Sequence, residues 1–167
     1  MSAPDGRRRL GEAPPLFMFF YGTLKRGQSN YDKYCSGALR VEGATVRGEI
    51  YDLPFGYPAL VVPHESIHAS GTGDPTVDAE KQRRLDRAQV AFPEGPRVSG
   101  ELFVFDDPGS RLPLIDRLEG FDPADDASHY RRVLLPTETN EGSRILAWAY
   151  VVDKTSGTYL PGGSWPP

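Results

Sequence analysis

The sequence contains little cysteine, little positive charge and no long apolar run. Cys35 is its only cysteine, so an intrachain disulfide and a cysteine-based zinc site are both excluded. A single thiol is typical of proteins kept in a reducing cytosol. No stretch reaches the roughly 20 apolar residues of a membrane span, and the apolar run that follows Arg7–Arg9 is too short for a secretory signal. We therefore expect a soluble, cytoplasmic protein with no membrane partner.

Positive charge is scarce and scattered. The net charge is −4, and the one dense basic cluster, at residues 7–9, lies in a polar segment with Gly and Pro nearby. Nucleic-acid-binding proteins usually present a basic face, so we expect no nucleic-acid partner. The histidines, His64, His68 and His129, show no metal-ligand pattern beyond one i, i+4 pair, and no P-loop is present. We expect neither a metal nor another cofactor.

Glycine and proline are plentiful instead. The 18 glycines and 16 prolines favour short strands, tight turns and few long helices. A chain of 167 residues suits one domain, which we place at residues 16–167 behind a flexible leader at 1–15. Strands outnumber helices and do not alternate with them. This order indicates an α+β fold built on a curled sheet or small barrel.

The expected strands are short runs rich in apolar, β-branched and aromatic residues. They cover residues 16–21, 41–53, 59–62, 98–105, 130–135 and 144–152, and the last two form a hairpin across the turn at 138–142. Weak helical patterns cover 30–35 and 78–90, and a clearer one covers 111–119, with Ser110 able to cap it. Gly48 inside the second run predicts a bulge or a close backbone approach.

Residues 64–96 stand apart from this pattern. Their first half is polar and rich in Gly, Ser and Thr, and their helical part has little apolar periodicity. Loops of this length are uncommon without a function or a structure of their own. We expect a surface insertion that contributes little to the core.

The first candidate site is the loop from Tyr21 to Leu24, where a buried strand ends at glycine. Successive backbone N–H groups in such a loop can converge into a nest that binds a carboxylate without a charged side chain. Gly22 would let a ligand approach the backbone and would tolerate unusual dihedral angles. A plain turn leaving a core strand explains the same residues, so both interpretations stay open.

Glu119 is the second candidate. Helical spacing puts Leu112, Ile115 and Glu119 in one row, so Glu119 borders the apolar face of its helix. It also lies at the helix C-terminus, where the dipole disfavours negative charge. Burial and the dipole both raise the pKa of a carboxyl group, as a general acid/base near neutral pH requires. The alternative is an ordinary surface glutamate paired with Arg or Lys.

The segment at Tyr130 also carries candidates. Strand alternation puts Tyr130 and Arg132 on one face and Arg131 on the other. Either arginine could bind a carboxylate, although a solvated strand face is the commoner explanation. Cys35 has no histidine near it in the sequence, which argues against a catalytic thiol.

An ordered set of motifs resembles a known family. Residues 21–28 (Tyr-Gly-Thr-Leu-Lys-Arg-Gly-Gln) look like the opening signature of the γ-glutamylcyclotransferase-like superfamily, and are especially similar to its γ-glutamylamine cyclotransferase, AIG2-like branch. Supporting matches follow in order at residues 46–53, 56–60, 98–103, 114–121, 130–132 and 147–150. The resemblance covers about residues 16–165, most of the chain.

The resemblance implies both a fold and an activity. The fold is a small mixed β-barrel with short peripheral helices. The activity is a cofactor-independent release of 5-oxoproline and a free amine from a small γ-glutamyl substrate, catalysed by an enzyme of acyltransferase or lyase type. Glu119 matches the family's catalytic glutamate. The predicted substrate-binding residues are Tyr21, Gly22, Thr23, Leu24 and Tyr130.

Two departures from the family pattern bear on specificity. The segment at 64–96 and the leader are both longer than the matching motifs require. For this reason the motifs do not predict which amine the enzyme releases. Two other functions stay open: a γ-glutamyl deprotection step in a biosynthetic pathway, and a non-catalytic small-molecule binding module. A pure binder has no need of a carboxyl group with a raised pKa, which favours an enzyme. The oligomeric state is not indicated by the sequence.

Overall fold

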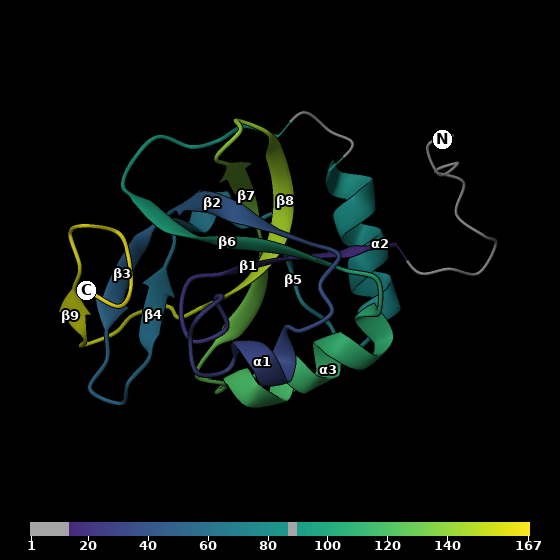
Figure 1. Cartoon of the computed structure of the whole chain (residues 1–167), viewed down its shortest axis with the longest axis horizontal. Helices are drawn as coiled ribbons and strands as arrows, with labels where there is room; N and C mark the ends of the chain where they lie inside the picture. The colour runs from purple at the N-terminus through teal and green to yellow at the C-terminus, as the bar shows by residue number, and fades with distance from the viewer. Residues whose placement is uncertain (1–13, 87–89) are drawn as a thin grey trace.

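A closed five-stranded barrel forms the centre of the computed structural model, which describes residues 14–86 and 90–167 (Figure 1). Its strands are β1 (Leu16–Phe20), β2 (Arg40–Arg47), β6 (Arg97–Phe105), β7 (Arg131–Thr139) and β8 (Arg144–Val151). They are ordered β2-β6-β1-β8-β7, and pairing of β2 with β7 closes the barrel. The expected α+β fold with a small mixed barrel is confirmed.

The strand directions bring distant segments to one end of the barrel. β1 runs parallel to β8 and antiparallel to β6, while β7 runs antiparallel to β8. The ends of β1 and β8 therefore meet the start of β7. As a result Tyr21, Tyr130 and Tyr150 gather at the same end, although more than a hundred residues separate the first from the other two.

A second sheet lies beside the barrel. It consists of β3 (Glu49–Asp52), β4 (Pro58–Val61) and β9 (Thr158–Tyr159), in the order β4-β3-β9. The expected strand at 41–53 is thus two strands, divided at Gly48. A Cβ atom on Gly48 would lie 2.8 Å from the carbonyl oxygen of Val61, so the expected close backbone approach is confirmed.

The helices cover one side of the barrel. They are α1 (Tyr31–Tyr34), α2 (Pro75–Asp86) and α3 (Pro108–Glu119), with a 3₁₀ turn η1 (His64–Ser66) between β4 and β5 (Ala69–Ser70). α3 begins earlier than expected because Pro108 fits its first turn, and Asp107 rather than Ser110 is the N-cap residue. None of the helices in the described ranges is long and apolar enough to span a bilayer.

β1 is buried on both faces, as expected. Leu16, Met18 and Phe20 pack in one core cluster, and Phe19 packs in the other. Leu112 and Ile115 of α3 join the first cluster and are fully buried. This packing fixes α3 against the barrel, so its last residue is held near the end of β1.

The described residues of 64–96 add few side chains to the core, as expected, since Ala79 is their one buried apolar residue, but the segment is firmly attached to the barrel. β5 adds a strand to the barrel by pairing with β7, and α2 packs against α3, β1 and β8. The Gln82 side chain accepts a hydrogen bond from the Phe17 amide (2.8 Å), and Asp86 accepts one from the Leu146 amide (2.8 Å).

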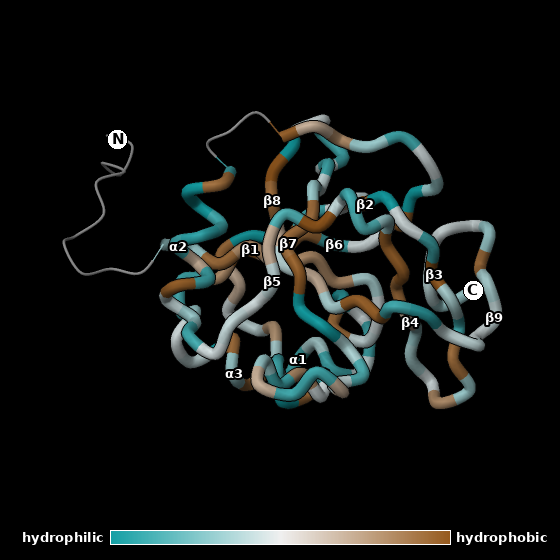
Figure 2. The backbone as a smooth tube through the Cα atoms, turned by 180° about the vertical axis from the view of Figure 1, so that it is seen from behind, coloured by the Kyte–Doolittle hydropathy of each residue, from teal (hydrophilic) through white to brown (hydrophobic). Residues whose placement is uncertain are grey.

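The polarity of α2 explains why its sequence resembled a surface helix. Figure 2 shows mostly hydrophilic residues along α2, next to the hydrophobic residues of β8. The helix attaches to the barrel through buried polar side chains such as Asp78 and Gln82, together with the small Ala79. Polar residues in these positions leave no apolar periodicity in the sequence.

Candidate active site

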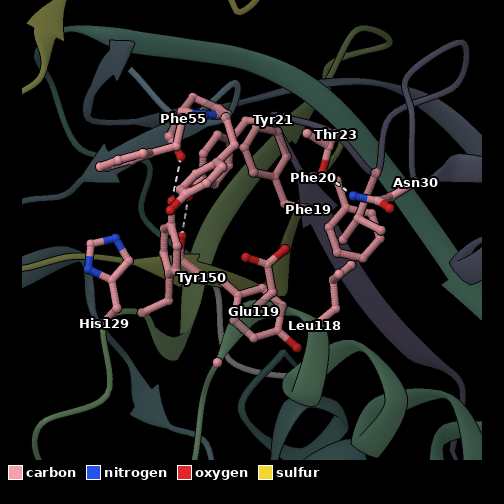
Figure 3. Close-up of a pocket in the computed structure, with 16 residues that line it drawn as sticks. Phe19, Phe20, Tyr21, Thr23, Asn30, Phe55, Leu118, Glu119, His129 and Tyr150 are labelled. Carbon is pink, nitrogen blue, oxygen red and sulfur yellow. Dashed lines mark hydrogen bonds between the residues drawn. The ribbon is translucent and has the colours of Figure 1, made fainter. Parts of the chain in front are cut away.

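A cavity of about 580 Å³ lies at the barrel end where β1 and β8 finish (Figure 3). Six segments line it: the end of β1 with the following loop (Phe19, Phe20, Tyr21, Gly22, Thr23, Leu24), Asn30, the β3–β4 connection (Phe55, Tyr57, Pro58), the end of α3 (Leu118, Glu119, Gly120), His129 with Tyr130, and Tyr150. The structure therefore brings every predicted site residue to one cavity. Their roles in catalysis and binding stay predictions.

Glu119 is held at this cavity by the way α3 ends. Gly120 adopts the left-handed conformation (φ 68°), its amide donates to the Arg117 carbonyl, and the Phe121 amide donates to the Asp116 carbonyl. This pair of bonds is the Schellman motif, in which glycine avoids the strain of a Cβ atom. The expected row is confirmed too, because Leu112 and Ile115 anchor the same face of the helix.

The surroundings of Glu119 favour its protonated form. Figure 3 shows its carboxylate pointing into the cavity. Burial, and after it the nearby negative charge of Asp116, raises the pKa of Glu119 to about 7. Within residues 14–86 and 90–167 no Lys or Arg forms an ion pair with it, unlike the surface glutamate of the alternative interpretation. Glu119 can therefore accept or donate a proton near neutral pH.

The loop from Gly22 to Leu24 offers free donors. Thr23 is fixed from the far side, because its carbonyl accepts from the Asn30 amide (2.9 Å) and its hydroxyl accepts from the Asn30 side chain (3.0 Å). No acceptor for the amides of Gly22, Thr23 and Leu24 exists within the described part of the chain. The loop also lines the cavity, so it can bind an anion there through backbone N–H groups.

Gly22 does not have the unusual dihedral angles expected of it, and a steric contact accounts for the glycine instead. Its φ angle is not positive, so no unusual dihedral explains the glycine. A Cβ atom at this position would instead lie 2.9 Å from two carbons of the Pro58 ring. The glycine lets the loop pack against β4, which contributes to the shape of the cavity.

Three tyrosines form much of the cavity wall. The hydroxyl of Tyr21 donates to the carbonyl of Tyr150, that of Tyr130 donates to the carbonyl of Pro58, and that of Tyr150 donates to Asp116, each at 2.6 Å. Burial raises the pKa of all three phenols above its ordinary value. They therefore stay neutral and contribute ring surface and rigidity to the cavity.

Neither arginine of the 130–132 segment lines the cavity. Arg132 is fully buried, and its guanidinium donates to Asp116 and Asp78. Arg131 lies on the other strand face and pairs with Asp153. The expected alternation of faces is therefore confirmed, while the solvated face that seemed the common explanation is wrong for Arg132.

Two further sequence expectations concern thiol and metal chemistry. Cys35 is buried, and this burial raises its pKa to about 12, so the thiol stays protonated. Among the described residues, no three His, Cys, Asp or Glu side chains cluster in a way that could hold a metal ion.

Several cavity residues were missed at the level of sequence. Among them are Asn30, Phe55, Tyr57, His129 and Tyr150. Residues 56–60 and 147–150 had been noted as family motifs without a role at the site. The parallel pairing of β8 with β1 is what carries Tyr150 to the cavity, and local pattern contains no signal for such pairing.

Comparisons with known proteins identify the family. The family model described as "Gamma-glutamyl cyclotransferase, AIG2-like" matches residues 18–93 and 87–167. A curated relative from Niallia circulans, a γ-L-glutamyl-butirosin B γ-glutamyl cyclotransferase, is 24% identical over 138 residues, which are 82% of this chain and 67% of the relative.

Two solved structures have a similar fold. YkqA from Bacillus subtilis gives a TM-score of 0.56 at 20% identity, over 90% of this chain but only 39% of that longer protein. An AIG2-like protein from Mus musculus gives a TM-score of 0.52 at 18% identity, over 91% of this chain and 88% of the other. Since the family model covers nearly all of the barrel and the cavity, this chain belongs to the γ-glutamyl cyclotransferase, AIG2-like family.

Proposed function

We propose that this protein is a γ-glutamyl cyclotransferase that releases 5-oxoproline and a free amine from a γ-glutamyl amine, peptide or small metabolite. The observation that carries the proposal is the position of Glu119, a carboxyl group with a pKa of about 7 that shares a cavity with the unpaired amides of residues 22–24. Membership of the family supports the same chemistry.

The loop amides bind the α-carboxylate of the substrate in this proposal. Backbone N–H groups without acceptors are suited to an anion, and no cationic side chain lines the cavity to compete for it. A substrate held at this end folds back so that its α-amine faces its own γ-carbonyl. Such orientation of an intramolecular attack is worth roughly 7–11 kcal/mol of barrier.

Glu119 moves the proton in this proposal. It accepts a proton from the α-amine as the nitrogen attacks the γ-carbonyl carbon and closes the five-membered ring. The same proton then passes to the leaving nitrogen as the amide bond to the amine breaks. One carbon–nitrogen bond forms and one breaks, and all the electrons stay within the substrate. Burial raises the pKa of Glu119 to about 7, so the side chain can both accept and donate the proton near neutral pH.

A γ-glutamyl deprotection step in a biosynthetic pathway is the second candidate. It uses the same reaction on a larger substrate. The observation that favours it is the name of the curated relative, a cyclotransferase for γ-L-glutamyl-butirosin B. Such a role differs from the first proposal only in the amine half of the substrate.

A product assay tests the reaction. The protein is incubated with γ-glutamyl-ε-lysine, γ-glutamyl dipeptides, glutathione and γ-glutamyl alkylamides, and 5-oxoproline and glutamate are quantified by mass spectrometry. We expect 5-oxoproline and amine in equal amounts from at least one substrate. Formation of glutamate instead would indicate hydrolysis, and no product from any substrate would leave a binding module as the better explanation.

A matched substrate tests the intramolecular step. Acetylation of the α-amine removes the nucleophile but leaves the γ-amide bond intact. We expect no release of amine from the N-acetylated form of the best substrate. Release at the same rate would mean that water, rather than the α-amine, attacks the carbonyl.

A further inference from the structure

The two sides of the cavity differ in chemistry. Figure 3 shows Thr23 and Asn30 on one side, Phe55 and His129 on the opposite side, and Glu119 between them. The first side offers the free amides of residues 22–24. The second side is aromatic, and we name Phe55, Tyr57, His129 and Tyr130 the aromatic rim.

The aromatic rim is a chain of rings in contact with one another, with an open outer edge at Phe55. Tyr57 is in ring contact with Phe55 (5.9 Å between centroids) and with Tyr130 (6.4 Å). His129 packs edge-on against Tyr130 at 4.6 Å. Phe55 is 72% exposed, more than any other large hydrophobic residue in the described part of the chain. A ligand that covers Phe55 would remove this apolar surface from water.

The charges around the cavity disfavour a ligand that places a carboxylate at the aromatic rim. No Lys or Arg is among the residues that line it, and its one acidic side chain is Glu119. A carboxylate held at the aromatic rim would find no Lys or Arg there, with the His129 imidazole as the one basic group, and would face the electron-rich ring surfaces. A neutral flat group would gain stacking contacts instead.

The order of groups along a γ-glutamyl substrate then assigns the rim. With the α-carboxylate at the amides of residues 22–24 and the γ-carbonyl beside Glu119, the amine half extends toward Phe55. We infer that the aromatic rim binds this amine half, and that the preferred amine carries a flat apolar group and no carboxylate. This inference rests on the proposed function and specifies its substrate class.

Three substrates test separately whether the amine half needs an aromatic ring and whether it must lack a carboxylate. γ-Glutamyl-phenethylamide and γ-glutamyl-phenylalanine differ only in a carboxylate, while γ-glutamyl-ethylamide lacks the ring. We expect kcat/KM for the phenethylamide to exceed that for the ethylamide by about three- to tenfold, the usual value of an aromatic contact, and to exceed that for γ-glutamyl-phenylalanine as well. Equal or faster turnover of γ-glutamyl-phenylalanine would overturn the inference and leave the cyclotransferase activity standing.

Phe55→Ser tests the rim directly. Phe55 is exposed and contacts Tyr57, so we expect the fold to tolerate the change. The preference for phenethylamide over ethylamide should fall toward one, mainly through KM. Leu39→Ser is the matched control, since Leu39 is 61% exposed and lies outside the cavity lining.

The outcomes distinguish a failure of the role of the aromatic rim from a failure of the proposed cyclotransferase function. A Phe55→Ser variant that keeps the full preference would overturn the role of the rim, and so would a Leu39→Ser variant that loses it equally. Absence of 5-oxoproline from all three substrates and from the wider panel would overturn the proposed function, and this inference with it.

Discussion

Asp116 and Glu119 lie three residues apart on α3, and their surroundings are opposite. Asp116 accepts two hydrogen bonds from Arg132 (2.8 and 3.1 Å) and one from the Tyr150 hydroxyl (2.6 Å). Glu119 has no cation beside it in the described part of the chain and faces the cavity. The same helix therefore carries one carboxylate that is fully engaged and one that is free to exchange a proton.

The engaged carboxylate belongs to a buried group, the Arg132 cluster, made of Asp78, Asp116, Arg132 and Tyr150. Arg132 and Asp78 are fully buried, and Arg132 also donates to the Thr72 carbonyl. The guanidinium lies over the rings of Phe121 and Trp148. The cluster thus joins α2 and α3 to β7 and β8, and the pairing of its charges makes it structural.

The comparison shows that burial of a carboxylate has different consequences with and without a neighbouring cation. A buried carboxylate with a matching cation keeps its charge and fixes the structure around it. A buried carboxylate without one has a raised pKa and becomes suited to proton transfer. The Arg132 cluster also contributes to Glu119, because the negative charge of Asp116 adds to the effect of burial on the pKa of Glu119.

The largest expected effect is on catalysis. We predict that Glu119→Gln lowers kcat/KM for 5-oxoproline release by about 10²- to 10⁴-fold, since an amide cannot transfer the proton. Thermal unfolding should show an intact fold. Glu141→Gln, in the exposed β7–β8 turn, is the matched control and should keep full activity. Equal rates for Glu119→Gln and the parent would remove Glu119 from the mechanism.

The next largest effect is on stability. Arg132→Met leaves the buried Asp78 and the partly buried Asp116 without a cation, and we predict a loss of about 3–5 kcal/mol in the free energy of unfolding measured with urea. The neighbouring Arg131 pairs with Asp153 at the surface. Arg131→Met should therefore cost at most about 1 kcal/mol. Similar losses for the two variants would contradict the structural role of the Arg132 cluster.

The pH dependence of stability gives a smaller effect with a definite sign. The pKa of Glu119 is about 7 in the folded protein and about 4.5 in the unfolded chain, so between these values the folded state binds more protons. Stability should therefore decrease as pH rises from about 4.5 to 7. We predict that Glu119→Gln gains about 1–3 kcal/mol relative to the parent across this range. A constant difference between the two proteins would contradict the raised pKa.

The smallest effect concerns the influence of the Asp116 charge on the pKa of Glu119. Removing the charge of Asp116 takes away the second cause of the raised pKa of Glu119. We predict that Asp116→Asn shifts the rising limb of the kcat/KM–pH profile to lower pH, with the same substrate in both assays so that its amine contributes equally. Asp107→Asn, at the start of the same helix, is the control and should leave the limb in place. An unchanged or raised limb in Asp116→Asn would mean that the two carboxylates are independent.

Local pattern was enough to predict part of the site. The apolar run at 16–21 predicted a buried strand, and helical spacing placed Glu119 above Leu112 and Ile115. The first depends on a continuous apolar run that ends at glycine and the second on a repeat of 3.6 residues, and both are visible in a short stretch of sequence. The strand that ends at glycine also marked the loop at residues 22–24 as a candidate, although a nest and a plain turn stayed open there.

The sequence by itself thus determined most of the barrel strands, the helix that carries Glu119, the family resemblance and the two candidate groups. Tertiary structure decided their surroundings: which carboxylate has a cation, which rings face Glu119, and how α2 attaches to the barrel. Arg132 donates a hydrogen bond to Asp78, 54 residues away in the sequence, and Tyr21 donates one to the carbonyl of Tyr150, 129 residues away. Such contacts depend on strand register and barrel closure, which no local period encodes, and a pKa depends on the charges and water that those contacts bring or exclude.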